Sequence, residues 1–223
     1  MARSVLGLML LAAAALLLRG MAPSADRSPP AAAQILRAQC AAAADGRLRR
    51  IAVELPLAAQ DLQALALLSR SVQLESIRLP KARADQAAAR RLARCFSLEE
   101  LVLGDTTWDD ADFSHLTALR RLRVLNLNST RATDAALPWL ARLHELEVLR
   151  LGSSRITGSG ANHLLSLHHL RHLIVQRAPL EDAALDVLAQ LPQLESLYLE
   201  GTRVSESGIA RLKQRRPDLH VHW

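Results

Sequence analysis

Aromatic residues are scarce in this 223-residue chain: Phe, Trp and Tyr together make up 3% of it, although 50% of the residues are hydrophobic. A core with so few rings must be filled by aliphatic side chains, and Leu and Ala dominate here. An aliphatic core with regular Leu spacing favours stacked small layers over one large globule. The scarcity of aromatic residues therefore directs attention to internal repeats.

Lysine is nearly absent too, since only Lys81 and Lys213 occur, so the formal net charge of +6 is carried by Arg. Heavy use of Arg, Ala and Leu can reflect a GC-rich genome. The alternative is attraction to acidic surfaces such as anionic glycans, lipid headgroups or nucleic acid.

Residues 1–25 form a targeting segment. Arg3 precedes an uncharged apolar run over residues 5–18, and small residues follow as far as Ala25. This layout is typical of a secretory signal peptide, and the run is short for a membrane span. We expect export to the periplasm or out of the cell, either with cleavage near Ala22 or Ala25 or with an uncleaved N-terminal anchor over residues 5–18.

Seven segments share the pattern Leu-x-x-[Leu/Ile]-x-[Leu/Val]. They begin at Leu48, Leu74, Leu98, Leu122, Leu146, Leu170 and Leu194. From Leu74 to Leu194 the starts are evenly spaced, with a period of roughly 24 residues that is typical of solenoid repeats. The unit from Leu48 is slightly longer, and a further start at Leu219 comes slightly later than the period predicts. We number each unit from its first Leu, which is position 0.

The rest of each unit keeps the same phase. Position 8 is Thr or Ser in four units and Ala178 in a fifth, and position 10 is apolar. Leucines at positions 15, 18 and 21 have the spacing of a helical or 3₁₀ stripe that faces inward. The Leu-x-Leu stretch alternates like a half-buried strand. Each unit is predicted to be a short strand, a turn and a short return helix.

This pattern resembles the leucine-rich repeat family over residues 48–223, and residues 122–134 are similar to the bacterial Thr-type repeats. The resemblance implies an α/β fold, a leucine-rich repeat solenoid with a curved parallel β-sheet on the concave side and short helices on the convex side. The family often has Asn at position 8, where its side chain bonds backbone groups along the stack. Thr and Ser offer one hydroxyl, and Ala178 offers none. We therefore expect a looser or water-bridged turn at Ala178.

The ends of such a stack need caps. Residues 26–33, with Pro29-Pro30, are predicted to be a linker, and residues 34–47 a helix that caps the N-terminal end. The repeat domain then covers residues 48–223, as seven repeats and a terminal strand. Lys213, Gln214, Arg215 and Arg216 replace the apolar side chain at position 21 with charge, so we expect the last helix to face solvent.

The two cysteines have two interpretations. Cys95 occupies position 21, a core position, where Cys serves well as a small buried hydrophobe. In an exported protein a Cys40–Cys95 disulfide is permitted, provided that the two Cα atoms approach within about 7 Å. Both the disulfide and separate thiols stay open.

No constellation for catalysis or metal binding emerges. Adjacent acids such as Asp109 and Asp110 would point to opposite faces of a strand, and no Gly-x-Ser-x-Gly elbow or phosphate loop occurs. No zinc-type Cys spacing is present. The histidines are not expected to converge on one point; they include His163, His168, His169, His172, His220 and His222. We predict a non-enzyme without catalytic residues, metal or cofactor.

Positions 2 and 4 of each strand are expected to face solvent on the concave side. In the C-terminal half they bring together Arg, aliphatic and aromatic side chains, the usual anchors of interfaces. The candidate binding residues are Asn126, Val148, Arg150, His172, Ile174, Ser196 and Tyr198. Exposed Val and Ile can also follow from β-propensity alone.

These features together predict a non-catalytic, monomeric scaffold that binds a protein or peptide along its concave sheet. The alternative is a basic binder of an anionic envelope polymer or glycan. Nucleic acid is disfavoured, because few aromatic side chains are available for base stacking and the chain carries an export signal. Membrane contact is expected only through an uncleaved N-terminal segment.

Overall fold

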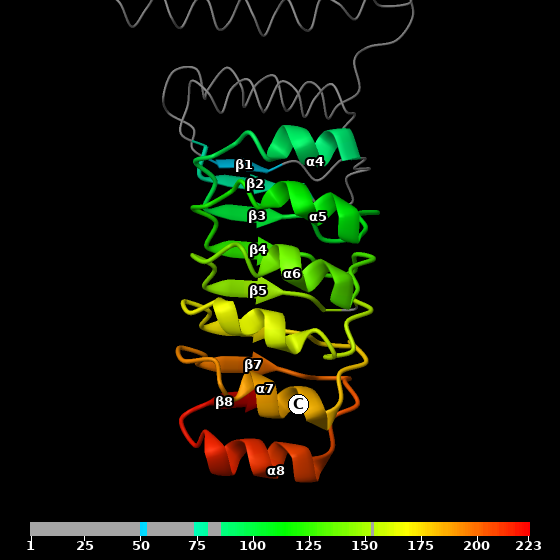
Figure 1. Cartoon of the computed structure of the whole chain (residues 1–223), viewed down its shortest axis with the longest axis vertical. Helices are drawn as coiled ribbons and strands as arrows, with labels where there is room; N and C mark the ends of the chain where they lie inside the picture. The colour runs from blue at the N-terminus through cyan, green and yellow to red at the C-terminus, as the bar shows by residue number, and fades with distance from the viewer. Residues whose placement is uncertain (1–49, 53–73, 80–85, 153) are drawn as a thin grey trace, which may run out of the picture.

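The leucine periodicity folds into a ladder of parallel strands. The computed structural model describes residues 50–52, 74–79, 86–152 and 154–223. One eight-stranded sheet runs through them, with every neighbouring pair parallel and the strands in chain order (Figure 1). The strands are β1 (Arg50–Ala52), β2 (Ser76–Arg78), β3 (Glu100–Val102), β4 (Val124–Asn126), β5 (Val148–Arg150), β6 (His172–Ile174), β7 (Ser196–Tyr198) and β8 (His220–His222).

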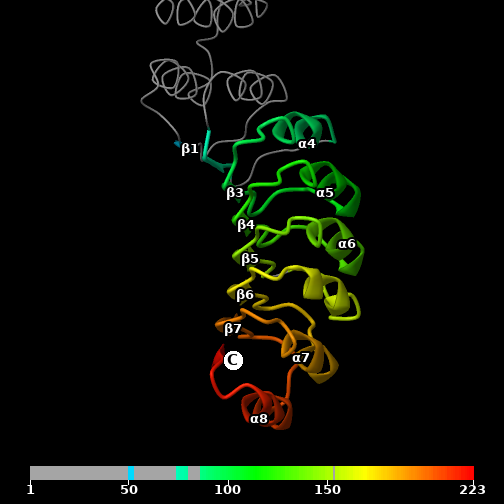
Figure 2. The same cartoon turned by 60° about the vertical axis from the view of Figure 1, so that its left-hand side comes forward.

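From β2 onward, short helices return the chain from each strand to the next. They are α4 (Gln86–Leu92), α5 (Asp110–Leu116), η1 (Asp134–Ala136) with α6 (Leu137–Leu140), the 3₁₀ helix η2 (Ala161–Ser166), α7 (Asp182–Leu188) and α8 (Glu206–Arg215). The helices lie on one side of the stack and the strands on the other, with the strands along the concave side (Figure 2). This is the predicted α/β solenoid.

The core consists of leucines that only neighbouring units can cover. At position 3, the central residue of each strand from β2 to β7 is fully buried. The stripe at positions 15, 18 and 21 is buried as predicted, for example at Leu137, Leu140 and Leu143. Cys95 is fully buried in the same stripe. A unit of this size cannot bury its own leucines, so stacking and folding are one event.

The turn after each strand is closed by backbone geometry. Position 7 has a left-handed backbone, with φ of 60° at Asp105, 58° at Ser129, 57° at Arg177 and 71° at Gly201. The amide of Ala178 donates to the Val175 carbonyl at 3.2 Å, and the equivalent bond of Thr130 to Leu127 measures 3.3 Å. The turn at Ala178 is therefore not looser than the turn at Thr130, because this bond needs no side chain at position 8. The water-bridged alternative stays a prediction.

Carboxylates at position 12 tie one unit to the next. Asp110 accepts from the amide of Thr133 at 2.8 Å and from its hydroxyl at 2.6 Å. Asp134 accepts from the Thr157 hydroxyl at 2.6 Å, and Asp182 accepts from the Ser205 hydroxyl at the same distance. The acids at Asp109 and Asp110 thus lie at the start of α5 and not on a strand, contrary to the sequence interpretation.

The series of position-12 carboxylates that begins at Asp110 is interrupted once. The unit from Leu146 has Gly158 at position 12, with φ of 95°, so it offers no carboxylate to the following unit. The same unit is the one whose return segment is the 3₁₀ helix η2, with no side-chain cap at Gly160. The loss of the position-12 acid and the change of helix type therefore occur in one repeat.

The last strand begins one residue earlier than the leucine spacing predicts. Leu219 is 4% exposed and takes the place of a position-0 leucine. His220 then pairs directly with Ser196 of β7, and its amide donates to the Glu195 carbonyl at 2.9 Å. In the other units one residue separates the position-0 leucine from its strand, whereas here the strand follows Leu219 directly. The strands therefore keep their register although Leu219 comes later than the period predicts.

The C-terminal end is charged, as expected. Residues 213–215 of α8 are exposed. Arg216 donates to the carbonyls of Ala189 at 3.2 Å, Leu191 at 2.9 Å and Leu194 at 2.8 Å. This guanidinium satisfies carbonyls of the segment that leads from α7 to β7.

Several sequence predictions concern other parts of the chain. The targeting segment over residues 1–25, the linker, the capping helix over residues 34–47 and Cys40 lie outside the described residues, so the disulfide stays a prediction. Within the described ranges, no helix combines the length and the apolar composition that crossing a membrane requires.

Candidate binding surface on the concave sheet

Two rows of side chains cover the concave face. Strand pairing aligns position 2, with Val148, His172 and Ser196 in neighbouring strands. It aligns position 4 in the same way, with Asn126, Arg150, Ile174 and Tyr198 in one row. Neighbouring members of a row are about 4.8 Å apart, which is the spacing of paired strands. The register therefore brings together all seven candidate residues on β4 to β7.

The N-terminal part of this face is occupied by its own polar contacts. Glu100 on β3 accepts from the Ser76 hydroxyl at 2.7 Å and from the Arg78 guanidinium at 2.5 Å. The charges on β2 and β3 thus compensate each other. This leaves the C-terminal half as the better candidate for binding.

Arg150 is the distinctive cation of the C-terminal half. Its side chain is exposed, and it makes no ion pair or hydrogen bond with the described residues. Val124 and Val148, half-buried, lie on β4 and β5 at position 2. An uncompensated guanidinium beside aliphatic surface can bind a carboxylate or a backbone carbonyl while apolar groups pack next to it.

Two candidate residues contribute less than expected. Ile174 is only 7% exposed, between Arg150 and Tyr198 in its row, so it supports the surface more than it forms it. The side-chain oxygen of Asn126 accepts from the amide of Asn128 at 3.0 Å, which shapes the following turn. His172, Ser196 and Tyr198 are half-buried, as residues that line a concave face should be.

Sequence reasoning missed His222. Its ring stacks on Tyr198, with centroids 4.3 Å apart and planes 4° from parallel. The leucine-based count put His222 at position 3, whereas strand pairing places it at position 4 next to Tyr198. Counting one repeat length on from Tyr198 would have found it. The stacked pair forms the C-terminal end of the surface.

A separate cleft of about 390 Å³ lies at the edge where the strands begin. Its lining includes Arg171, Glu195 and Arg216, and these side chains already bind neighbours. The hydrogen bond to Glu195 and the negative charge of that carboxylate raise the pKa of Arg171. A cleft whose charges are paired internally offers a ligand little.

Within the described ranges, no group of three His, Cys, Asp or Glu side chains is placed to hold a metal ion. The surface offers a guanidinium, two stacked rings and aliphatic groups, which suit recognition of another molecule.

Comparisons with known proteins agree with this architecture. No protein-family model matches the sequence, and no curated protein sequence matches it. Internalin C2 from Listeria monocytogenes is similar in structure with a TM-score of 0.59 and 20% identity, over 82% of this chain and 89% of that chain. A leucine-rich repeat protein of Leptospira interrogans gives a TM-score of 0.57 at 16% identity, over 82% of this chain and 51% of that one.

A plant peptide hormone receptor, solved in complex with RGF2, matches with a TM-score of 0.51 at 14% identity, over 78% of this chain and 28% of that chain. At these identities the likeness concerns the fold. The parallel ladder, its regular register and these neighbours define one class, the leucine-rich repeat solenoid. This chain has that fold, as the repeat pattern predicted.

Proposed function

We propose that this chain is a non-catalytic scaffold that binds a protein or peptide segment across β4 to β8 of its concave sheet. The observation that carries the proposal is Arg150, exposed and without an ion pair among the described residues, next to aliphatic surface and close to the stacked Tyr198–His222 pair. Arg and Tyr dominate the energetics of many interfaces.

The comparisons support binding in general terms. One structural neighbour is a plant peptide hormone receptor solved in complex with RGF2, which supports protein or peptide binding in general. The alternative of an anionic polymer on the concave face has weaker support, because Arg78 there is paired with Glu100. The proposal includes export, the bacterial Thr-type repeat and a monomeric state, each of which rests on the sequence.

The test begins with capture of a partner from the native envelope fraction, followed by measurement of its affinity by calorimetry. We expect the double substitution Arg150→Ala, Tyr198→Ala to weaken binding at least tenfold, because it removes both anchors. The matched control is Arg142→Ala, Phe96→Ala, which removes one Arg and one exposed ring away from the concave face. If the Arg150→Ala, Tyr198→Ala variant binds the partner with full affinity, the proposal is contradicted.

A further inference from the structure

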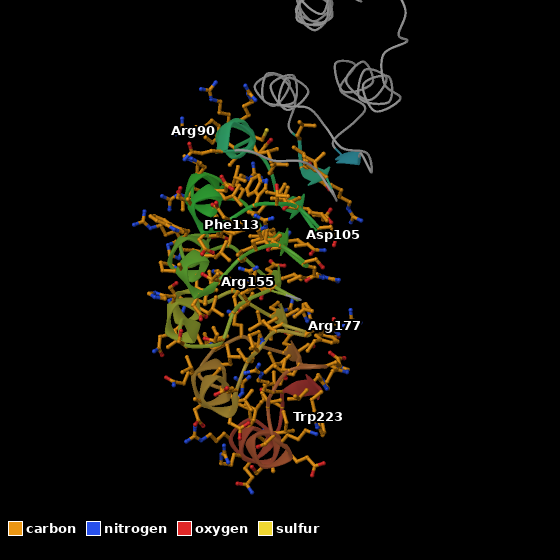
Figure 3. The ribbon with its side chains drawn as sticks, turned by 90° about the vertical axis from the view of Figure 1, so that its right-hand side faces the viewer. Arg90, Asp105, Phe113, Arg155, Arg177 and Trp223 are labelled. Atoms are coloured by element: carbon orange, nitrogen blue, oxygen red, sulfur yellow. The ribbon has the colours of Figure 1, made fainter. Side chains whose placement is uncertain are left out.

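Arginines gather at the edge of the sheet where the strands end. Three of them occupy position 9 of their units and the fourth occupies position 7: Arg131, Arg155, Arg203 and Arg177. All four are exposed. Figure 3 looks onto this edge, with Arg155 and Arg177 on it. We call these four residues the arginine edge.

The backbone fixes how the position-9 arginines are displayed. The amide of Arg155 donates to the Ala132 carbonyl at 2.9 Å, and that of Arg203 donates to the Leu180 carbonyl at 2.9 Å. Their neighbours at positions 8 and 10 point inward, with Ser154 and Ile156 buried on either side of Arg155. Alternation along this extended segment therefore sends position 9 outward in each unit.

Arg177 reaches the same edge by a less common conformation. Its φ is 57°, in the region where Gly, Asn and Asp are the usual residues and where a long side chain is disfavoured. The neighbouring unit has Gly201 at the same position, and a Cβ there would lie 3.3 Å from the Arg177 Cγ. The absence of a side chain at Gly201 leaves room for that of Arg177.

Three of these four cations have no ion-pair partner among the described residues, and the fourth has only a long ion pair. Arg131, Arg155 and Arg177 form no ion pair with the described residues, and Arg203 is 4.0 Å from Glu181. At the opposite edge, by contrast, Arg123 binds Glu147 at 2.6 Å and Arg171 binds Glu195 at 2.5 Å. The opposite edge thus pairs its arginines at short distances, whereas three of the four residues of the arginine edge present unpaired charge to solvent.

The chemistry of the edge selects the kind of ligand. Guanidinium groups bind carboxylates in a bidentate fashion. Positions 6 to 9 of the units from Leu122 to Leu194 contain no aromatic residue, so the edge offers no platform for bases or sugar rings. Glu181 and Glu200 lie among the arginines. A polymer with a negative charge on every unit would be repelled by these two carboxylates.

The length of the edge fits a short peptide. Arg131 and Arg203 are three units apart, which is roughly 14 Å at the spacing of paired strands. That distance corresponds to about four or five residues of an extended chain. A segment whose acidic residues are separated by neutral ones could meet the arginines and avoid the two glutamates.

We propose that the arginine edge is a docking surface for an extended acidic polypeptide segment. The surface is separate from the concave face, so it stands without the function proposed above. Binding there depends on Arg131, Arg155, Arg177 and Arg203 acting together.

The probe is a fluorescein-labelled octapeptide of alternating Glu and Ser, with alternating Gln and Ser as the uncharged control. Anisotropy is measured at low and at physiological ionic strength. We expect binding of the Glu peptide that weakens strongly with salt, because the charges are solvent-exposed. The quadruple substitution of the arginine edge to Gln should weaken binding at least tenfold, with an unchanged thermal unfolding midpoint.

Three further arms decide the interpretation. A control with Arg90, Arg120, Arg142 and Lys213 replaced by Gln loses the same charge away from this edge, and it should stay within twofold of wild type. The concave variant Arg150→Ala, Tyr198→Ala should also bind the probe normally. Oligogalacturonate and a short DNA duplex should compete weakly.

Four results would overturn the proposal. They are no binding of the Glu peptide at low salt, an equal loss in the charge-matched control, loss in the concave variant, and tighter binding of oligogalacturonate or DNA than of the peptide. Because the concave variant is tested separately, failure here is distinguishable from failure of the proposed function.

Discussion

At the scale of single residues, the buried hydroxyls of position 8 are not equivalent. Thr130 donates to the Leu127 carbonyl at 2.8 Å, whereas Thr106 is 4% exposed and its hydroxyl has no hydrogen-bond partner among the described residues. A buried polar group without a partner costs about 1–3 kcal/mol, while a satisfied one contributes about 1 kcal/mol.

We therefore expect opposite effects from one substitution at these two sites. Thr106→Val removes an unpaired hydroxyl with little change in shape and should raise the free energy of unfolding by about 1 kcal/mol. Thr130→Val should lower it by about 1 kcal/mol, because a hydrogen bond is lost. Urea denaturation of both variants tests this, and equal shifts in the same direction would contradict the assignment.

Asp134 gives the fold a dependence on pH. Burial alone would raise the pKa of its carboxyl, but hydrogen bonds from Thr157, Ser159 and the Gly158 amide outweigh burial and lower the pKa below its ordinary value. The stabilisation is then fully present above the unfolded pKa and is lost as the pH falls through the folded pKa. Acid should therefore weaken the fold.

We expect the unfolding midpoint to fall between about pH 5 and pH 2, and the Asp134→Ala variant to show a smaller fall. At pH 7 this variant should be less stable by about 1–2 kcal/mol. Thermal unfolding across this pH range, followed by circular dichroism, measures both effects. An unchanged slope in Asp134→Ala would show that other groups carry the acid sensitivity.

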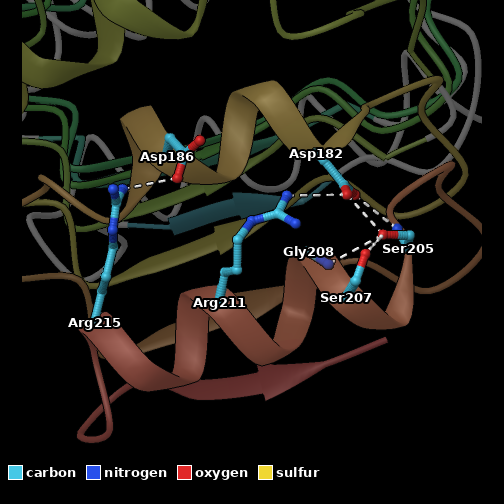
Figure 4. A network of polar contacts seen from close by, with 7 residues as sticks. All are labelled: Asp182, Asp186, Ser205, Ser207, Gly208, Arg211 and Arg215. Atoms are coloured by element: carbon cyan, nitrogen blue, oxygen red, sulfur yellow. Dashed lines mark hydrogen bonds and ion pairs between the residues drawn. The ribbon is translucent and has the colours of Figure 1, made fainter.

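At the scale of elements, one repeat differs from the others in its contacts with the next unit. The close-up in Figure 4 shows the regular arrangement, in which Asp182 at the start of α7 receives bonds from Ser205 and Arg211 of the next unit. Arg215 donates to Asp186 at 2.7 Å one turn further on. The unit with Gly158 lacks the position-12 acid and returns through η2.

A side chain at Gly158 would meet a more severe steric conflict than one at Gly201. A Cβ on Gly158 would lie 2.6 Å from the Ala184 Cβ, and φ there is 95°. We expect Gly158→Ala to lower the free energy of unfolding by about 1–3 kcal/mol. Gly201→Asn should lower it by less, because Asn tolerates the left-handed region and its Cβ would meet only the flexible Arg177 side chain, at 3.3 Å. Chemical denaturation of both variants provides the comparison, and a neutral Gly158→Ala would refute the steric argument.

At the scale of the whole molecule, stability is a sum over units and their contacts, so the ends are the weakest places. Arg216 secures the C-terminal end by donating to the Ala189 and Leu191 carbonyls of the preceding unit and to the Leu194 carbonyl at the start of its own unit. Its side chain is 18% exposed. The hydrogen bond with Asp218 raises the pKa of Arg216, which keeps the guanidinium charged.

We expect Arg216→Ala to speed hydrogen exchange in α8 and β8, while amides of β4 and β5 stay protected. The physical reason is that three carbonyls lose their donor at the end of the stack, at a cost on the order of 2 kcal/mol, and local opening does not spread inward. Exchange measured by mass spectrometry with peptide resolution checks this. Uniformly faster exchange along the stack would mean that the repeats unfold as one unit.

The leucine spacing by itself determined the fold. Leu125, Leu149 and Leu173 are buried because a short unit with this stripe has no other way to remove its leucines from water. The same phase predicted that Arg150 and Tyr198 share one row of the concave face, and that Cys95 is in the core. Periodicity carries this information because it is local and repeats in every unit.

Tertiary structure alone decided the features that depend on contacts between units. The position of His222 beside Tyr198 follows from strand pairing, which overrides the spacing of Leu194 and Leu219. The burial of Ile174 depends on its neighbours, Arg150 and Tyr198, in the row. Whether an Arg is paired depends on the residue one unit away, which is why Arg123 is compensated and Arg155 is not.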